Sequence, residues 1–339
     1  MKTFGKNAIL YSFNKVLRGI IGDNAYRNIT SRLITLVKLR KYYTRDLGTS
    51  KNNVRPYVVY MADGRVNHGG LADRIYGIVS LFIFCKKEHA DFRVNFTNPF
   101  NLIEYIVPNE YDWRIDEDSI SYNKTQARPV FLKPVRKELC HEYMKSKMKK
   151  VMGKEQLHVY TNCYCFDSDF SSAFFELFRP SDHLLSEINE NLSRIGGPFL
   201  SVTFRFQQLL GDFEEGGFAV LPDDKKKILI KHCIDFVATV VNENPLIHKA
   251  LVTSDSKTFL SEISGELDYV YVIPGDVYHV GYTHKNEEQA YIKSFLDLFL
   301  ISKAEIVYNF SEGDMYANSG FARLASVIGN KQYINVRND

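Results

Sequence analysis

The sequence predicts an α/β protein with two domains and a basic, helical N-terminal arm. Three observations support this fold class. Strand-like apolar runs alternate with helix-like periodic segments after residue 198. A separate strand–turn–helix unit begins at Tyr57. The length of 339 residues, 45% of them hydrophobic, suffices for two cores. We expect the arm at 1–55, the first domain at 56–195 and the second at 196–339.

The first domain is expected to open with a strand at Tyr57–Tyr60, a polar turn and a helix. The turn ends in Asn67-His68-Gly69-Gly70, and apolar residues then recur at helical spacing from Leu71 to Phe82. A glycine pair here lets backbone N–H groups approach a phosphate or a sugar, although an ordinary tight turn has the same pattern. Further expectations are strands at Phe92–Phe96 and Ala127–Val135, an irregular charged stretch at 110–150, an aromatic stretch at Tyr164–Phe178 and a boundary at Ile195–Pro198.

The second domain is a regular alternation of predicted strands and helices. The expected strands are Phe199–Phe204, Lys249–Thr253, Tyr269–Ile273, Glu305–Tyr308 and Gln332–Val336. The expected helices are Asp223–Asn242, Thr258–Ile263, Glu287–Ser302 and Gly320–Ile328. Strands separated by helices pair in parallel, so their carboxyl ends share one edge of a sheet.

The charge of the chain is concentrated in the arm. Residues 1–55 hold twelve Lys or Arg and two Asp, a net +10, whereas the whole chain is +3, so the remainder is −7. Aliphatic clusters at 9–21 and 33–39 make the arm amphipathic, which is typical of helices that lie on anionic membranes. A helical arm packed on the protein is the alternative. No apolar run reaches the roughly 18–20 residues of a membrane span.

We therefore expect peripheral contact of residues 1–50 with the inner face of the cytoplasmic membrane. A nucleic acid partner is not expected, because the basic residues alternate with aliphatic ones and the main body is acidic. No signal peptide is recognised at the N-terminus, so a cytoplasmic location is predicted.

The cysteines are expected to be buried free thiols. There are five, an odd number, at positions 85, 140, 163, 165 and 233. Cysteines of a reducing compartment are normally unpaired. Cys163 and Cys165 are separated by one residue and have no second pair, so a zinc site is disfavoured. No metal is predicted.

Polar groups follow three strands of the second domain. Arg205 and Asp212 follow the first strand, Ser254-Asp255-Ser256 the second, and Ser319-Gly320 opens a helix after a later one. Ligands of parallel α/β sheets bind at the carboxyl ends of strands. An arginine fork and a helix N-terminus favour phosphate, and an aspartate accepts hydrogen bonds from ribose or a base. A nucleoside diphosphate therefore suits this edge.

Each of these groups also has a purely structural explanation. Ser254, Asp255 and Ser319 could cap helices, Arg205 could form a structural ion pair, and Asp73 with Arg74 could be partners on a surface helix. Their joint placement after strands of one sheet favours the functional interpretation.

Several enzyme classes are disfavoured by motifs that the sequence lacks. It contains no Gly-x-x-x-x-Gly-Lys-[Ser/Thr], no Gly-x-Gly-x-x-Gly after a strand with an acid about 20 residues on, and no Gly-x-Ser-x-Gly. The sequence therefore argues against P-loop NTPases, dinucleotide oxidoreductases and serine-elbow hydrolases. The nucleotide region also lacks Asp-x-Asp, which argues against a metal-dependent, single-domain glycosyltransferase.

Four collinear blocks together span roughly residues 57–339. They are Asn67–Ser80, with its Gly-Gly-Leu, then Val202–Phe206 with Gly211–Phe213, then Leu251–Ser256, with its Thr-Ser-Asp turn, and finally Asp297–Tyr308 with Asn318–Ala325. They resemble the Gly-Gly-Leu opening, the His-x-Arg…Gly-Asp block, the Thr-Asp turn and the C-terminal block of the fucosyltransferase superfamily, in its bacterial surface-polysaccharide branch. Two departures are Thr203, where many members have His, and the insertion Gln207–Leu210 before Gly211-Asp212.

The resemblance implies a GT-B fold, in which two Rossmann-like domains face a central cleft. It implies an inverting glycosyltransferase with a GDP-sugar donor, most often GDP-fucose, and without an essential metal or cofactor. The donor would bind mainly to the second domain and the acceptor, a glycan or lipid-linked glycan of a bacterial capsule or lipopolysaccharide, mainly to the first.

The expected site residues follow from both arguments. Catalytic roles fall to Arg205 and to a carboxylate base, for which Asp212 is the first choice and Glu215 and Asp73 follow. His68, Asp73 and Arg74 are expected on the acceptor side. The donor is expected to contact Gly69, Gly70, Arg205, Ser254, Asp255, Ser256, Ser319, Gly320, Phe321 and Arg323.

Two other functions remain open. The departures at Thr203 and Gln207–Leu210 would also suit a catalytically silent sugar-nucleotide or glycan-binding subunit at the membrane. Another nucleotide-donor transferase, such as a sulfotransferase, is the third possibility.

Overall fold

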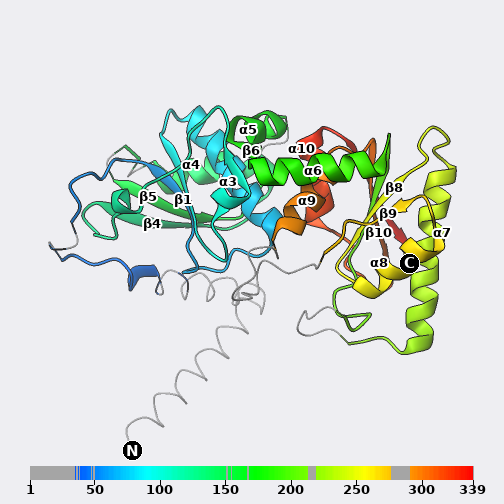
Figure 1. Cartoon of the computed structure of the whole chain (residues 1–339). Helices are drawn as coiled ribbons and strands as arrows, with labels where there is room; N and C mark the ends of the chain where they lie inside the picture. The colour runs from blue at the N-terminus through cyan, green and yellow to red at the C-terminus, as the bar shows by residue number, and fades with distance from the viewer. Residues whose placement is uncertain are drawn as a thin grey trace, which may run out of the picture.

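The computed structural model places two parallel sheets side by side, with helices packed between and around them (Figure 1). It describes residues 35, 37, 39–46, 48, 50–149, 152–153, 155–165, 168–212, 219–275 and 291–338. The predicted amphipathic arm lies outside the described residues over 1–34. None of the helices in the described ranges has the length and apolar character that crossing a membrane requires.

The first sheet has four parallel strands in the order β2-β1-β5-β4. β1 is buried along its whole length, as its apolar run predicts. β5 was not predicted, because its buried side chains include Gln156 and His158, whose hydrogen-bond partners lie far away in sequence. The bounds are β1 Val58–Ala62, β2 Phe92–Phe96, β4 Ala127–Leu132 and β5 Gln156–Thr161.

Helix α3 (Leu71–Lys87) follows β1 and packs closely on the first sheet. A Cβ added at Gly77 would lie 2.2 Å from the carbonyl oxygen of Thr161 in β5. Glycine is therefore required at this crossing, because a larger residue would push the helix off the sheet. The apolar periodicity from Leu71 to Phe82 predicted this helix correctly.

Helix α4 (Lys137–Met148) lies in the stretch that was expected to be irregular. The helix is mostly polar, but Cys140, Met144 and Met148 form an apolar stripe at helical spacing and are all buried. Cys140 forms a disulfide with Cys165, with the two Cα atoms 5.4 Å apart. The prediction that all five thiols are free is therefore wrong for this pair. Cys85, Cys163 and Cys233 are free and buried.

Short elements lead from the first sheet to the second. Helix α6 begins after Ser181, whose hydroxyl accepts a hydrogen bond from the Leu184 N–H, and ends at Gly196, whose φ is 74°. The small antiparallel pair β3–β6 lies before it. The bounds are η2 Leu102–Glu104, β3 Ile106–Pro108, η3 Glu117–Ser119, α5 Phe170–Leu177, β6 Phe178–Pro180 and α6 Asp182–Ile195.

The second sheet has five parallel strands in the order β11-β10-β7-β8-β9, so the strand order reverses between β7 and β10. The predicted alternation is confirmed, and the predicted helix from Glu287 is described from Ile292 onward. The strands are β7 Leu200–Phe204, β8 Ala250–Ser254, β9 Val270–Tyr271, β10 Ile306–Glu312 and β11 Gln332–Asn338. The helices are α7 Asp223–Asn242, α8 Lys257–Glu266, α9 Ile292–Ile301 and α10 Gly320–Gly329.

One hydrophobic core joins the two sheets. It runs from β1 and α3 through α5, α9 and α10 to one face of the second sheet. Phe295 of α9, for example, stacks on Tyr105 with ring centroids 4.7 Å apart. α7 and α8 cover the opposite face of the second sheet. Because apolar packing continues across the boundary, it fixes how the two sheets face each other.

Candidate functional site

The candidate site lies at the carboxyl edge of the second sheet, beside the point where the strand order reverses. β7 ends at Phe204, and Arg205 follows it directly. β8 ends at Ser254, and Asp255 follows. Open parallel sheets bind ligands at such a switch point.

Asp255 fixes the backbone that follows β7. Its side chain is 4% exposed, and its carboxylate accepts hydrogen bonds from the backbone N–H groups of Phe206 (2.8 Å) and Gln207 (2.9 Å). Gln207 has a φ of 56°, in the left-handed region that non-glycine residues seldom adopt. Burial raises the pKa of Asp255 to about 6, although Arg205 and the N–H groups favour the ionised form.

Arg205 is held next to Asp255 and remains partly exposed. Its Nε lies 4.0 Å from a carboxylate oxygen of Asp255, and a quarter of its side chain is accessible. Its guanidinium carbon is 5.9 Å from the ring centroid of Tyr316. The arrangement presents a positioned cation at the edge of the sheet.

Asp212 contacts the first turn of α8. Its Oδ2 accepts hydrogen bonds from the Ser256 hydroxyl and the Thr258 N–H, each at 2.8 Å. Ser256 is itself the N-cap of α8 and accepts from the Phe259 N–H at 3.1 Å. The structural explanation for Ser256 as a cap thus holds, and Asp212 supports the same helix end. Glu215 lies outside the described residues.

The loop before α10 brings the second half of the predicted site to Arg205. The Tyr316 N–H donates to the Arg205 carbonyl at 3.0 Å. Asn309 of β10 donates from Nδ2 to the Ala317 carbonyl at 3.2 Å. The structure therefore places Arg205, Asp255 and the start of α10 along one edge.

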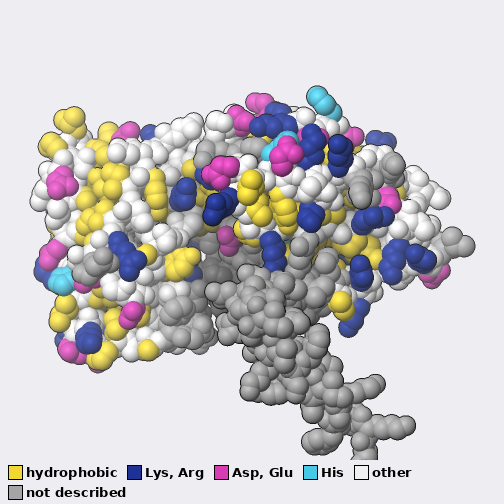
Figure 2. All heavy atoms as spheres, turned by 180° about the vertical axis from the view of Figure 1, so that it is seen from behind, with side chains coloured by type: hydrophobic (Ala, Val, Ile, Leu, Met, Phe, Trp, Pro, Cys, Tyr) yellow, Lys and Arg dark blue, Asp and Glu magenta, His cyan; other side chains and the backbone are white. Residues whose placement is uncertain are grey.

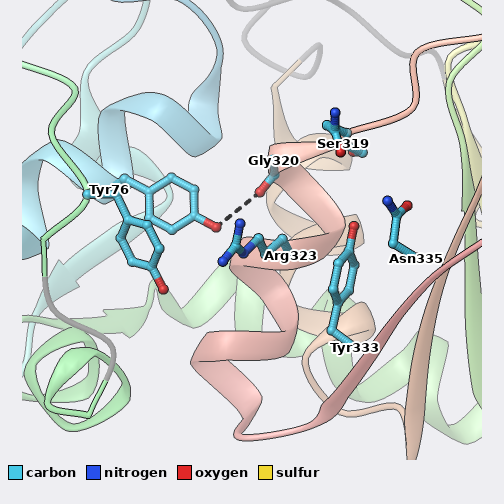
Figure 3. Close-up of a pocket in the computed structure, with 8 residues that line it drawn as sticks. Tyr76, Ser319, Gly320, Arg323, Tyr333 and Asn335 are labelled. Atoms are coloured by element: carbon cyan, nitrogen blue, oxygen red, sulfur yellow. Dashed lines mark hydrogen bonds between the residues drawn. The ribbon is translucent and has the colours of Figure 1, made fainter. Parts of the chain in front are cut away.

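A pocket of about 240 Å³ lies at the N-terminus of α10, between the two domains (Figure 3). Tyr76 and Tyr164 line it from the first domain. Tyr76 donates a hydrogen bond to the Gly320 carbonyl at 3.3 Å. A helix N-terminus beside an arginine favours an anionic group. The second domain lines the pocket with Asn318, Ser319, Gly320, Arg323, Tyr333 and Asn335.

The pocket includes three of the ten predicted donor residues, all from the start of α10, and Arg205 and Asp255 are not among its lining residues. Ser319, Gly320 and Arg323 line it, whereas Phe321 packs against the shared core. Tyr76, Tyr164, Tyr333 and Asn335 were missed by sequence reasoning. Tyr164 opened the aromatic stretch, but tyrosines in apolar elements are usually part of a core.

In the first-domain loop, Gly69 is the position that needs glycine. Gly69 has a φ of 72°, and an added Cβ would lie 2.5 Å from the Asp73 carboxylate. Gly70 has a φ of −74° and no atom within 4 Å of an added Cβ. The Gly70 N–H donates to Asp73 at 3.3 Å. Asp73 is exposed and available to a ligand.

His68 and Arg74 support this loop from inside. They are 2% and 4% exposed. Arg74 donates to the carbonyls of Gly69 (3.2 Å) and Asn98 (2.7 Å). Burial, together with the charge of Arg74, lowers the pKa of His68 to about 4, so the imidazole is neutral at pH 7. The structure thus places these two predicted acceptor-side groups behind the loop surface.

Across the described part of the chain, no three His, Cys, Asp or Glu side chains are arranged so that they could hold a metal ion.

Comparison of the sequence with protein-family models and with curated proteins finds no match. Among solved structures, NodZ α-1,6-fucosyltransferase from crystals soaked with GDP-fucose superposes with a TM-score of 0.50 at 14% identity, over 81% of this chain and 92% of that one. The chain has the fold of that fucosyltransferase. The predicted GT-B fold is thereby confirmed.

Two further structures are similar at lower scores. Fucosyltransferase NodZ from Bradyrhizobium gives a TM-score of 0.48 at 13% identity, over 80% of this chain and 92% of that one. POFUT1 in its apo form gives a TM-score of 0.47 at 10% identity, over 84% of this chain and 99% of that one.

Proposed function

We propose that the protein is an inverting glycosyltransferase that transfers a sugar from a GDP-sugar to a glycan acceptor of a bacterial surface polysaccharide. Fucose is the first sugar to test. The observation that supports this most directly is that Arg205 and the N-terminus of α10 both lie at the carboxyl edge of the second sheet, beside the point where the strand order reverses. The solved structure with this fold was soaked with GDP-fucose, which supports the choice of donor.

The proposed donor contacts follow from the charges at this edge. Arg205 and the first turn of α10, with Arg323, would hold the diphosphate. The pocket of about 240 Å³ is smaller than most sites for whole ligands, which occupy roughly 300–1,000 Å³. We therefore assign it to the phosphate and sugar end of the donor. Asp255 would shape the backbone at 205–207, against which the nucleoside lies.

The proposed step is a direct displacement. The acceptor hydroxyl attacks the anomeric carbon opposite to the GDP oxygen, the new C–O bond forms as the old one breaks, and the leaving diphosphate carries the electron pair. A carboxylate accepts the hydroxyl proton. Asp73, Asp212 and Glu215 remain the candidates, and neither a metal nor a cofactor is part of the proposal.

A catalytically silent binding subunit is the second candidate function. It is favoured by the hydrogen bonds that occupy Oδ2 of Asp212 at the start of α8. Thr203, at the position where many relatives have His, is paired with Thr253 at 2.9 Å inside the sheet. Asp212, the first candidate for the base, and Thr203, at the position of the family's histidine, are therefore both engaged in structural contacts.

Thermal-shift measurements with UDP-, GDP-, CMP- and dTDP-sugars test the donor, and a transfer assay with GDP-fucose tests the activity. We expect selective stabilisation by GDP compounds, which Arg205→Ala removes and Arg205→Lys reduces. Arg194→Ala is the control, because Arg194 is an exposed residue of α6 that pairs with Glu190. Unchanged transfer by Arg205→Ala would refute the assignment of Arg205.

The alternative has its own signature in the same experiment. Binding of GDP compounds with neither sugar transfer nor donor hydrolysis across an acceptor panel would favour a silent subunit. Adenosine 3′,5′-bisphosphate is added to the thermal-shift panel, and a preference for it over GDP would instead indicate a sulfotransferase.

We also propose that the N-terminal arm brings the protein to the inner face of the cytoplasmic membrane. The structure restricts the deletion that can test this. Leu39 is buried in a cluster with Val59 and Tyr160 of the first sheet, and Tyr43 is buried with its hydroxyl 2.6 Å from Nδ1 of His158 in β5. A deletion should therefore stop at residue 34. We expect it to weaken binding to anionic vesicles and to preserve activity in solution, and unchanged vesicle binding would contradict the proposal.

A further inference from the structure

A group of polar and aromatic side chains at the carboxyl edge of the first sheet has no part in the proposed donor site. We call it the Arg65 cluster, and it consists of Tyr42, Asp63, Arg65, Tyr122 and Tyr160. Asp63 and Arg65 follow β1, and Tyr160 lies near the end of β5. This is the edge at which parallel sheets bind ligands.

Asp63 is the buried centre of the Arg65 cluster. Its side chain is 5% exposed, and its Oδ2 accepts hydrogen bonds from the hydroxyls of Tyr160 (3.1 Å) and Tyr122 (3.3 Å) and from Nη1 of Arg65. Its Oδ1 accepts from the Arg65 N–H at 3.1 Å. These bonds fix both the backbone and the guanidinium of Arg65.

The guanidinium of Arg65 is held between two tyrosine rings. Its central carbon is 4.0 Å from the Tyr122 ring centroid and 4.9 Å from that of Tyr42. Nη1 donates to Asp63 and to the Tyr122 hydroxyl. Nε and Nη2 donate to none of the residues that the structure describes, and 26% of the side chain is exposed. That remaining edge has the geometry that binds a carboxylate or phosphate through two hydrogen bonds.

The charge around Arg65 favours an anion. Burial raises the pKa of Tyr122 to about 12 and that of Tyr160 still further, so both phenols stay protonated and donate to Asp63. Asp63 and Arg65 cancel each other's charge. The segment 39–46, which contains Tyr42, carries three exposed cations and one exposed acid. This local excess of cations raises the concentration of anions near the cluster. On the face shown in Figure 2, Lys and Arg side chains lie among Asp and Glu over the first-domain half.

The Arg65 cluster adjoins the loop that was predicted to face the acceptor. His68 stacks on Tyr160 with centroids 5.9 Å apart. His68 and Arg74 are buried, so their side chains offer almost no surface to an acceptor. Tyr42, at 48% exposure, and Arg65 do offer surface. The groups that this edge of the sheet offers to a ligand are thus the guanidinium of Arg65 and the ring of Tyr42 beside it.

We propose that the Arg65 cluster binds an acidic sugar of the acceptor glycan, with its carboxylate or phosphate on the Nε and Nη2 edge of Arg65 and its ring against Tyr42. The assignment rests on the proposed function and gives the acceptor a chemical class. Asp63, Tyr122 and Tyr160 act as positioning residues, because they hold Arg65 and do not contact the sugar.

Titration calorimetry with three matched sugars tests the assignment. Methyl β-D-glucuronide and glucose 6-phosphate carry the two oxyanions, and methyl β-D-glucoside is the neutral control. We expect the wild-type protein to prefer an anionic sugar by about tenfold, the size of one charge-assisted pair of hydrogen bonds. A preference for the glucuronide assigns a uronate, and a preference for glucose 6-phosphate assigns a sugar phosphate.

Variants identify the residue responsible. Arg65→Gln should abolish the preference for an anionic sugar, and Arg65→Lys should keep a part of it. Tyr42→Ala should weaken the binding of all three sugars. Arg93→Gln is the matched control, because Arg93 also lies over two tyrosine rings, Tyr57 at 4.5 Å and Tyr111 at 5.8 Å, but near the amino end of β2. Tyr42 is exposed, so Tyr42→Ala gives a result even if Arg65→Gln fails to fold.

The outcomes separate this inference from the proposed function. Equal affinity of the wild-type protein for all three sugars, or a preference that survives Arg65→Gln, overturns the inference. GDP binding is measured in the same samples and should be unchanged in every variant. Loss of the preference with intact GDP binding supports both proposals, whereas an Arg65-dependent preference in a protein that does not bind GDP leaves only the anion site.

Discussion

Tyr76 of α3 donates a hydrogen bond of 3.3 Å to the backbone carbonyl of Gly320, the first residue of α10. The bond connects a helix of the first domain to the helix end at which the donor phosphates are proposed to bind. Tyr76 also lies against Tyr164, with ring centroids 4.2 Å apart, and both rings line the pocket. The pocket therefore depends on how the two domains face each other.

Tyr76→Phe should lower the free energy of unfolding by about 1 kcal/mol, because one partly buried hydrogen bond is lost. It should also weaken binding of GDP-fucose more than binding of GDP, since the pocket is assigned to the phosphate and sugar end. Calorimetry with both ligands measures the difference. Tyr143→Phe is the control, because the Tyr143 hydroxyl accepts a hydrogen bond from Lys133 away from the pocket. An equal loss of affinity for GDP and GDP-fucose would refute the assignment of the pocket.

Gly69→Ala and Gly70→Ala should behave differently. At Gly69 the positive φ and the Asp73 carboxylate 2.5 Å from the new Cβ oppose alanine, so we expect a loss of about 1–2 kcal/mol of stability. At Gly70 the backbone suits alanine and the space is open, so the fold should be unaffected. Thermal unfolding measures both variants.

The same pair tests whether a ligand approaches the loop. If Gly70→Ala keeps its stability but loses transfer, the Cβ obstructs a substrate. If Gly70→Ala retains full transfer, no substrate comes close to this position, and the glycine pair is a turn.

The sequence predicted elements wherever their own residues carry the signal. The second domain was predicted well because its strands are apolar and its helices amphipathic. β5 was missed because it buries the polar side chain of His158, whose ring nitrogens form hydrogen bonds with Tyr43, at 2.6 Å, and Gln156, at 2.7 Å. The bond to Tyr43 spans 115 residues, so no local pattern could reveal it.

The candidate site was likewise predicted only in part. Arg205, Asp255 and Ser319 could be placed together because parallel strands present their carboxyl ends at one edge. Which side chains remain available could not be predicted, because that depends on tertiary contacts. Sequence spacing does not show that Arg74 donates to the carbonyls of its own loop, or that Tyr76 faces a pocket.

Asp212→Asn decides between a catalytic and a structural role for this residue. The variant keeps an oxygen that can accept from Ser256 and Thr258, so the cap of α8 should be largely retained. If Asp212 is the base, transfer should fall at least about a hundredfold, the usual contribution of general base catalysis. Asp212→Ala should lose stability as well, by about 1 kcal/mol, because the helix end loses its acceptor.

The control for Asp212 is Ser256→Ala, which removes the neighbouring cap without removing a carboxylate. Transfer that is equal in wild type and Asp212→Asn would assign the residue to α8 alone. Asp73 and Glu215 would then be the remaining candidates for the proton acceptor.

Asp255 should make the stability of the protein depend on pH in a direction opposite to that of most carboxylates. Burial raises its pKa to about 6, from the value of 3.8 expected for an exposed group. Between these values the folded protein binds the proton more strongly than the unfolded chain does, so the free energy of unfolding falls as pH rises. The two pKa values differ by about two units, which corresponds to at most roughly 3 kcal/mol.

Asp255→Asn provides the measurement, because asparagine cannot ionise. The free energy of unfolding of the wild-type protein minus that of Asp255→Asn, obtained from urea unfolding, should decrease as the pH is raised from 4 to 7. The subtraction removes groups with the opposite dependence, such as His68, whose lowered pKa favours the folded state at higher pH. A constant difference across this range would mean that Asp255 is ionised throughout, and that Arg205 and the N–H groups of Phe206 and Gln207 outweigh the cost of burying its charge.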